Sequence, residues 1–112
     1  MQRGEVWWAD LGKARGSAPG HRRPILIVQS DDFNRSSIST AVVVGLTTNM
    51  ALARAPGNVV CRPRASGLPK PSVINVSQVA TVDRGDLLEC VGLLPEALMR
   101  QVEEGLRLIL AL

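Results

Sequence analysis

Six short runs rich in apolar and β-branched residues most strongly limit what this chain can fold into. They are residues 5–9, 24–29, 40–46, 58–62, 72–76 and 78–82. Each run has the length of a β-strand, and loops rich in glycine and proline separate several of them. Short strands with bent connections in so short a chain predict a small β-barrel.

Finer features of these runs make the prediction more specific. Residues 24–29 and 40–46 are almost continuously apolar, which is typical of strands buried on both faces. Trp7 and Trp8 are adjacent on the first strand, so they should point to opposite faces, and only one is expected in the core. Asn75 and Ser77 indicate a turn between the last two runs.

The remaining segments are predicted to be connections. Residues 31–35 suit a single helical turn, residues 10–22 and 50–56 suit loops, and residues 83–86 suit a turn. Residues 63–71 hold three prolines and are also predicted to be a loop.

The C-terminal segment has a helical pattern instead. Pro95 suits the first position of a helix that runs to Leu112, and Leu98, Val102, Leu106 and Ile109 fall on one stripe. The apolar sector is wider than a core-facing helix needs, which leaves two alternatives: a subunit contact, or a helix sunk deeply into its own domain. The expected fold is therefore one domain, residues 1–112, mainly β with a C-terminal α-helix.

Positive charge is concentrated in the front of the chain. Residues 1–70 hold ten Lys or Arg and four Asp or Glu, a balance of +6, whereas residues 71–112 hold three and six, a balance of −3. Eleven of the 13 basic residues are arginine, whose planar fork suits phosphate. This distribution favours a polyanionic partner, although genomic base composition and solubility are an alternative explanation.

Several functional classes find no support in the sequence. No apolar run is long enough to cross a bilayer, and no signal peptide is evident, so a cytoplasmic protein without membrane attachment is expected. Two cysteines, Cys61 and Cys90, suit buried thiols better than a disulfide framework. Two cysteines and one histidine make a poor set of metal ligands, so no metal is expected. The common phosphate-loop and serine-nucleophile motifs are missing, and no cofactor is expected.

Hydroxyl and guanidinium groups gather at predicted strand ends and in the first long loop. These residues are Ser17, Arg22, Arg23, Thr47 and Thr48. Such groups suit phosphate oxygens, so they could hold a nucleic-acid backbone. They could also cleave RNA, because its 2′-hydroxyl can attack the adjacent phosphorus and leave a 2′,3′-cyclic phosphate and a 5′-hydroxyl. His21, the sole imidazole, is either a general base or a solvated loop residue.

The order of the motifs resembles one known family. The blocks are RGEVWWADLG (3–12), GSAPGHRRPILIVQSDDFN (16–34), TAVVVGLTTN (40–49), PGNV (56–59), GLPKPSVINVSQVATVDR (67–84) and the final helix. End to end, they resemble the MazF/PemK toxins. That resemblance implies an SH3-like small β-barrel and a toxin of a type II toxin–antitoxin system. It further implies a ribosome-independent, sequence-specific endoribonuclease, an mRNA interferase of the hydrolase class, that cleaves single-stranded mRNA without a metal.

The resemblance also assigns roles to residues. Arg23 would be catalytic, stabilising the phosphorane, with protonation of the leaving oxygen as a further candidate role, and Thr47 would hydrogen-bond a phosphate oxygen. Ser17 would contact substrate, although Ala18 replaces the glutamate usual in that loop. The remaining RNA-binding candidates are Arg22, Thr48 and Asn49.

Partners follow from the same resemblance. A homodimer, a cognate MazE-like antitoxin and DNA binding as a complex with that antitoxin are implied. A positive groove near Arg22, Arg23 and Arg54 would attract an acidic antitoxin tail. Two alternatives are a CcdB-like DNA gyrase poison of the same fold and a general single-strand binder. This chain lacks the Trp-Gly-Ile C-terminus on which the gyrase poisons depend. Its three aromatic residues offer few surfaces on which the bases of a single strand could stack.

Overall fold

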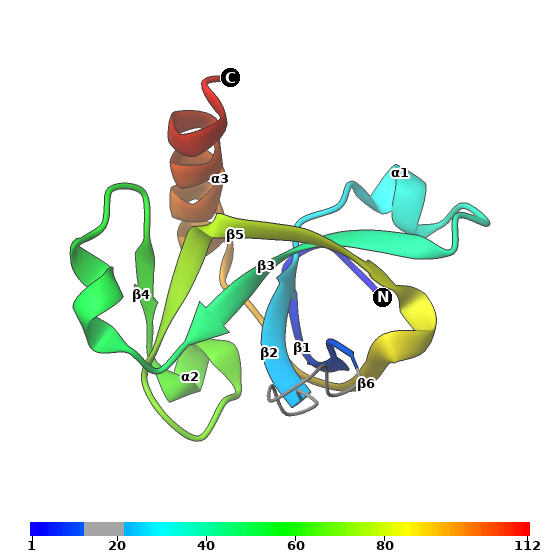
Figure 1. Ribbon diagram of the computed structural model, residues 1–112, viewed down its shortest axis with the longest axis horizontal. Helices are drawn as coiled ribbons and strands as arrows, with labels where there is room; N and C mark the ends of the chain where they lie inside the picture. Colours follow the sequence, from blue (N-terminus) through cyan, green and yellow to red (C-terminus); the bar gives the residue numbers. More distant parts are fainter. Residues whose placement is uncertain (13–21) are drawn as a thin grey trace.

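A single antiparallel sheet forms the body of the protein. The computed structural model describes residues 1–12 and 22–112. The sheet order is β4-β5-β3-β2-β1-β6, and the sheet curls into a half-barrel (Figure 1). Its strands are β1 (Glu5–Asp10), β2 (Arg22–Ile27), β3 (Thr40–Thr47), β4 (Val59–Cys61), β5 (Ser72–Asp83) and β6 (Leu87–Leu93).

Short helical segments and one long helix complete the fold. They are α1 (Asp31–Asn34), the 3₁₀ helix η1 (Met50–Arg54), α2 (Pro63–Ser66), the 3₁₀ helix η2 (Arg84–Asp86) and α3 (Glu96–Leu110). The mainly β fold with a C-terminal helix is thus confirmed, and α2 and η1 form inside segments predicted to be loops. Proline at the first position of α2 and glycine in a left-handed conformation after it explain why α2 is a single turn.

The last two predicted strands are one strand, because a bulge replaces the expected turn. Along β3, Val44 pairs with Val79 but Gly45 pairs with Asn75, so three residues of β5 are left outside the ladder. Asn75 still accepts hydrogen bonds from the backbone and hydroxyl of Ser77, as in a turn. The bulge bends β5 sharply where it crosses the sheet (Figure 1).

Strand β6 lies in a segment for which no strand was predicted from the sequence. This strand pairs with β1 at one edge of the sheet and is largely exposed. Its sequence, LLECVGL, lacks the apolar pattern of a buried strand, which explains why the pattern did not reveal it.

Two apolar clusters occupy opposite faces of β1 and β2. Val6 and Leu26 belong to the larger cluster, beneath α3, whereas Ala9 and Ile25 belong to the smaller one. Trp8 packs against the larger cluster and Trp7 against the smaller. The two rings point to opposite faces as predicted, but the expectation that only one reaches the core is wrong, because this sheet has a core on each side.

The two thiols differ in environment. Cys61 is fully buried, and burial raises the pKa of its thiol, so it stays protonated in the core. Cys90 is exposed on β6, which corrects the expectation that both thiols are buried. Both are free cysteines rather than a disulfide pair.

Helix α3 buries one side near its beginning and exposes apolar residues at its end. Met99, Val102 and Gly105 are buried, and α3 contacts β4 and β5. Leu108, Ile109, Leu110 and Leu112 are exposed, so the deeply sunk alternative is wrong. No helix in residues 1–12 or 22–112 is long and apolar enough to span a membrane.

The carboxylate of Asp31 ties α1 to the N-terminal segment. Its Oδ1 accepts hydrogen bonds from the backbone N–H of Arg3 at 2.8 Å and from Nδ2 of Asn34 at 3.0 Å. These donors favour the charged form and lower the pKa of Asp31. A lowered folded-state pKa gives stability that is present above the unfolded pKa and is lost as the pH falls through the folded one.

We therefore expect Asp31→Ala to lower the free energy of unfolding by about 1 kcal/mol at neutral pH. The difference from wild type should shrink as the pH falls below about 4, where the unfolded carboxyl protonates. Urea unfolding at several pH values measures this. The control is Asp32→Ala, which removes an exposed ion pair to Arg35 and should change stability little at any pH. A pH-independent loss in Asp31→Ala would contradict the expectation.

Candidate functional site

The antiparallel pairing of β2 and β3 brings Arg23 and Thr47 together. Ile25 pairs with Gly45 at the end of the ladder between the two strands, and Arg23 and Thr47 lie two residues beyond that pair, on the same face. Both residues lie where their strands begin or end, so their side chains stand at the rim of the sheet. The two predicted catalytic residues therefore meet in space although they are far apart in sequence.

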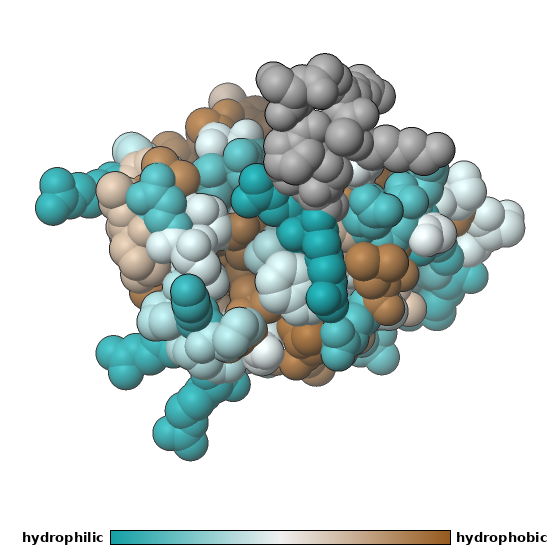
Figure 2. Space-filling model, turned by 60° about the horizontal axis from the view of Figure 1, so that its bottom comes forward, coloured by the Kyte–Doolittle hydropathy of each residue, from teal (hydrophilic) through white to brown (hydrophobic). Residues whose placement is uncertain are grey.

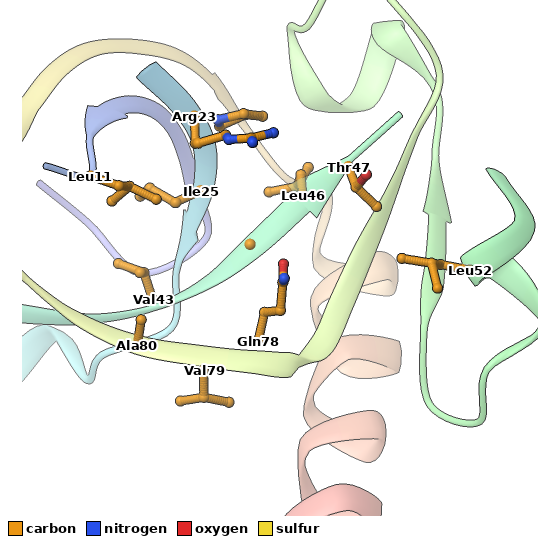
Figure 3. A pocket seen from close by; sticks show the side chains of 12 residues that line it. Leu11, Arg23, Ile25, Val43, Leu46, Thr47, Leu52, Gln78, Val79 and Ala80 are labelled. Carbon is orange, nitrogen blue, oxygen red and sulfur yellow. The ribbon is translucent and has the colours of Figure 1, made fainter. Parts of the chain in front are cut away.

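Arg23 and Thr47 line one groove of about 480 Å³. Its floor is apolar and is contributed by β2, β3 and β5 together with Leu11 and Leu52 (Figure 3). Among the described residues that line it, Arg23 carries the one charge, and Thr47 and Gln78 supply the other polar side chains. A guanidinium, a hydroxyl and an amide over an apolar floor suit an anion attached to an organic group.

The hydroxyl of Thr47 has a defined orientation. Its Oγ1 accepts a hydrogen bond from the backbone N–H of Asn49 at 3.1 Å, which leaves its own proton to donate. Asn49 in turn caps η1, since its Oδ1 accepts from the backbone N–H of Ala51. Thr47 is thus prepared to donate to an anion, and Asn49 holds the turn that orients it.

Gln78 also lines the groove, although it was not among the residues predicted from the sequence. It is one of the residues that the bulge in β5 leaves outside the ladder, and its side chain extends from β5 into the groove (Figure 3). The Gln78 side chain passes close to Gly45, because a Cβ at that position would lie 2.7 Å from Oε1 of Gln78. A glycine inside a strand pattern signals close approach of another group, and that signal could have pointed to Gln78.

Two other predicted RNA-binding residues lie on the opposite face of the sheet. The guanidinium of Arg22 lies 4.9 Å from the centroid of the Trp8 ring and forms an ion pair of 3.1 Å with Glu89. Thr48 lines a smaller hollow that also contains Trp8 and is separate from the groove. The structure therefore does not bring Arg22 and Thr48 together with Arg23 and Thr47.

Residues 13–21, most of the predicted first loop, lie outside the described residues. They include Ser17, Ala18 and His21, so the predictions for these positions stay predictions. Arg54 is exposed at the end of η1, next to the segment that supplies Leu52 to the groove. Within the described part of the chain, no group of three or more His, Cys, Asp or Glu could hold a metal ion.

Charge around the groove is asymmetric. A neighbouring groove shares Leu11 and Ala80 with the first and contains Asp10, Asp83 and Asp86. The face in Figure 2 carries many projecting hydrophilic side chains with hydrophobic surface between them. An anionic chain that binds at Arg23 would be repelled on the side of these three carboxylates.

Comparisons with known proteins show which sequences and structures this chain is similar to. Residues 2–110 match the family of PemK-like, MazF-like toxins of type II toxin–antitoxin systems. The chain is 44% identical to endoribonuclease MazF6 of Mycobacterium tuberculosis over 112 residues, which cover all of this chain and 98% of that protein. It is 36% identical to endoribonuclease EndoA of Bacillus subtilis over the same length, covering 96% of that protein.

Solved structures show the same fold. An endoribonuclease from a mycobacterial species, in complex with its cognate antitoxin, matches with a TM-score of 0.82 and 27% identity, over all of this chain and 96% of that one. The Mycobacterium tuberculosis toxin MazF-mt6 matches with a TM-score of 0.77 and 21% identity, over 96% and 97% of the two chains. The latter likeness concerns the fold alone.

Proposed function

Because this chain belongs to the PemK-like, MazF-like family of type II toxin–antitoxin toxins, we propose that it is an endoribonuclease toxin that cleaves single-stranded mRNA. The observation that carries the proposal is the groove in which Arg23, Thr47 and Gln78 converge. The relatives named as endoribonucleases align with the whole chain, so the alternative of a CcdB-like gyrase poison is not favoured.

The substrate supplies the nucleophile of the proposed reaction. The 2′-oxygen forms a bond to phosphorus, the bond from phosphorus to the 5′-oxygen breaks, and the products carry a 2′,3′-cyclic phosphate and a 5′-hydroxyl. One proton leaves the 2′-oxygen and one joins the 5′-oxygen. No metal takes part in this scheme, because alignment and charge neutralisation are what the protein must provide.

Arg23 and Thr47 each have a role in this scheme. Arg23 neutralises charge on the phosphorane, and its N–H groups are the candidate proton donor to the leaving 5′-oxygen. Thr47 donates to a nonbridging oxygen, as its bond from Asn49 allows. The described residues that line the groove include no carboxylate or imidazole, so in this scheme water accepts the first proton.

Partners of this chain follow the same proposal. A relative of known structure binds its cognate antitoxin, and we extend that to a MazE-like antitoxin here, acting in the cytoplasm. The exposed apolar end of α3 supports a homodimer, since Leu108, Ile109 and Leu112 would otherwise face water. An acidic antitoxin tail would compete with RNA for Arg23.

The direct test is digestion of a long single-stranded RNA in EDTA. The purified protein should cut it at a limited set of sites without ribosomes. The 5′ ends of the products should accept labelled phosphate from a polynucleotide kinase without prior phosphatase treatment, because they carry a free hydroxyl. The 3′ ends should show the mass of a cyclic phosphate. Primer extension then gives the recognition sequence. Intact RNA with a well-folded protein would contradict the proposed function.

Thr47→Val should lower kcat about 10- to 100-fold with little change in KM, because it removes a charge-assisted hydrogen bond to the phosphate. Thr47→Ser should retain most activity, since the hydroxyl remains. Steady-state cleavage of a fluorescent RNA measures both. The matched control is Thr81→Val on β5, which lines the neighbouring acidic groove and should behave as wild type. Equal kcat in Thr47→Val and wild type would remove Thr47 from the mechanism.

Gly45→Ala should lower kcat/KM about fivefold, because its Cβ would displace the Gln78 amide from the groove. Stability should change little, since the displaced atom is the far end of a flexible side chain. Gln78→Ala should have the same effect, and the double variant should lose no more than either single one. Additive losses in this cycle would show that Gly45 acts independently of Gln78.

A further inference from the structure

A second, smaller hollow lies beside the groove, on the other face of the same strand ends. Its volume is about 170 Å³, and its walls include Trp8, Pro24, Thr48, Leu68, Lys70 and Ser72. The mechanism above does not use it. We propose that this hollow holds the base of a nucleotide next to the cleaved bond, and that Lys70 contacts the phosphate of that nucleotide. This inference rests on the proposed function.

The hollow adjoins the groove at the rim of the sheet. Pro24 lines both of them. Thr47 lines the groove and Thr48 the hollow, so one step along the chain separates a phosphate contact from a base contact. If an RNA chain places one phosphate at Arg23 and Thr47, the nucleotide next to that phosphate therefore reaches the hollow.

The walls of the hollow suit a planar ring. Trp8 offers aromatic surface, and Pro24 and Leu68 add apolar contacts. The Trp8 ring is held in place, because Arg22 stacks on it at 4.9 Å and is itself paired with Glu89. A site that is already ordered loses less conformational entropy when it binds a base. In this arrangement Arg22 positions Trp8 instead of contacting RNA.

The three polar residues of the hollow have different roles. Ser72 is buried and its Oγ donates to the backbone oxygen of Lys70 at 3.1 Å, so it fixes the turn that carries Lys70. Thr48 is exposed and its hydroxyl can meet a base edge. The ammonium of Lys70, also exposed, is free to reach a phosphate at the mouth of the hollow.

Charge favours RNA over an apolar peptide side chain as the occupant. On one side of the groove lie Asp10, Asp83 and Asp86, and on the other lies the hollow with Lys70. A polyanion centred on Arg23 gains by running toward Lys70 and loses by running toward the carboxylates. The two sides together direct the strand across Pro24 into the hollow.

The test uses an RNA with a mapped cleavage site and variants in which each nucleotide flanking the cleaved bond is abasic. With wild type, one of the two abasic RNAs should raise KM about five- to 100-fold, the range expected for loss of one stacked base. Thr48→Phe, which fills the hollow, should raise KM for the intact RNA and abolish the difference between intact and abasic RNA. Thr81→Phe, in the acidic groove, is the matched control and should keep that difference.

Two further measurements do not depend on Thr48→Phe folding well. Lys70→Gln should reduce the slope of log affinity against log salt by about 0.7, the value for one phosphate contact on a single strand. In Trp7→Phe, whose remaining tryptophan is Trp8, a non-cleavable RNA with a 2′-deoxy group at the cleaved nucleotide should quench the fluorescence.

The outcomes separate this inference from the proposed function. RNA cleavage by wild type, with the same abasic discrimination in Thr48→Phe and no quenching of Trp8, would overturn the base site and leave the endoribonuclease standing. The hollow would then be open to an apolar side chain of a protein partner. Failure of wild type to cleave any RNA would overturn both.

Discussion

Replacing Arg23 with alanine is expected to lower kcat for RNA cleavage by about 10²- to 10³-fold, the usual cost of removing a donor that stabilises transition-state charge. Arg23 is exposed and makes no salt bridge within the described part of the chain, so its removal should leave the melting temperature near that of wild type. Single-turnover cleavage and thermal unfolding measured on the same preparation separate chemistry from folding.

Two further variants test whether the shape of the guanidinium or its charge and position account for the effect of Arg23. Arg23→Lys keeps the charge but replaces the planar fork with one ammonium, so its activity should fall between alanine and wild type. Arg35→Ala removes the same charge from an exposed ion pair on α1 and should cleave RNA normally. If Arg23→Ala retained wild-type kcat, the groove described above would not be the catalytic site.

The proposed catalytic pair could be inferred from sequence because it depends on strand ends. Arg23 and Thr47 adjoin two strongly apolar runs, and runs of that kind are readily identified as strands. Antiparallel pairing of consecutive strands then places the start of one beside the end of the next, which needs no knowledge of side-chain packing. The resemblance supplied the roles, and the register of β2 and β3 explains why those residues meet.

Gln78 and the base-sized hollow could not be inferred in the same way. Gln78 enters the groove because a bulge leaves it outside the ladder and because Gly45 has no side chain, and neither fact is visible in a period-2 pattern. The hollow joins Trp8 to Lys70 through α2 and the turn after it, a segment expected to be a loop. Local periodicity does not encode such contacts between distant segments.

The position of α3 depends on a contact between two glycines that periodicity also leaves hidden. A Cβ on Gly105 would lie 2.2 Å from the carbonyl oxygen of Gly57, and a Cβ on Gly57 would lie 3.1 Å from Cα of Gly105. Gly57 has φ of +85°, a conformation that side chains disfavour. The backbone of the helix therefore contacts the backbone of the turn before β4. Backbone atoms cannot move aside as the end of a flexible side chain can.

Gly105→Ala should accordingly destabilise the protein by about 3 kcal/mol, since it forces a methyl group into backbone atoms. For a domain of this size that loss corresponds to a fall of about 10–20 °C in melting temperature, measurable by circular dichroism. The control is Gly85→Ala in η2, where an added Cβ meets nothing within 4 Å, so its midpoint should stay near wild type. Gly105 does not line the groove of Arg23 and Thr47, and the folded fraction of Gly105→Ala should cleave RNA at the wild-type rate. A wild-type melting temperature in Gly105→Ala would show that α3 does not rest against Gly57.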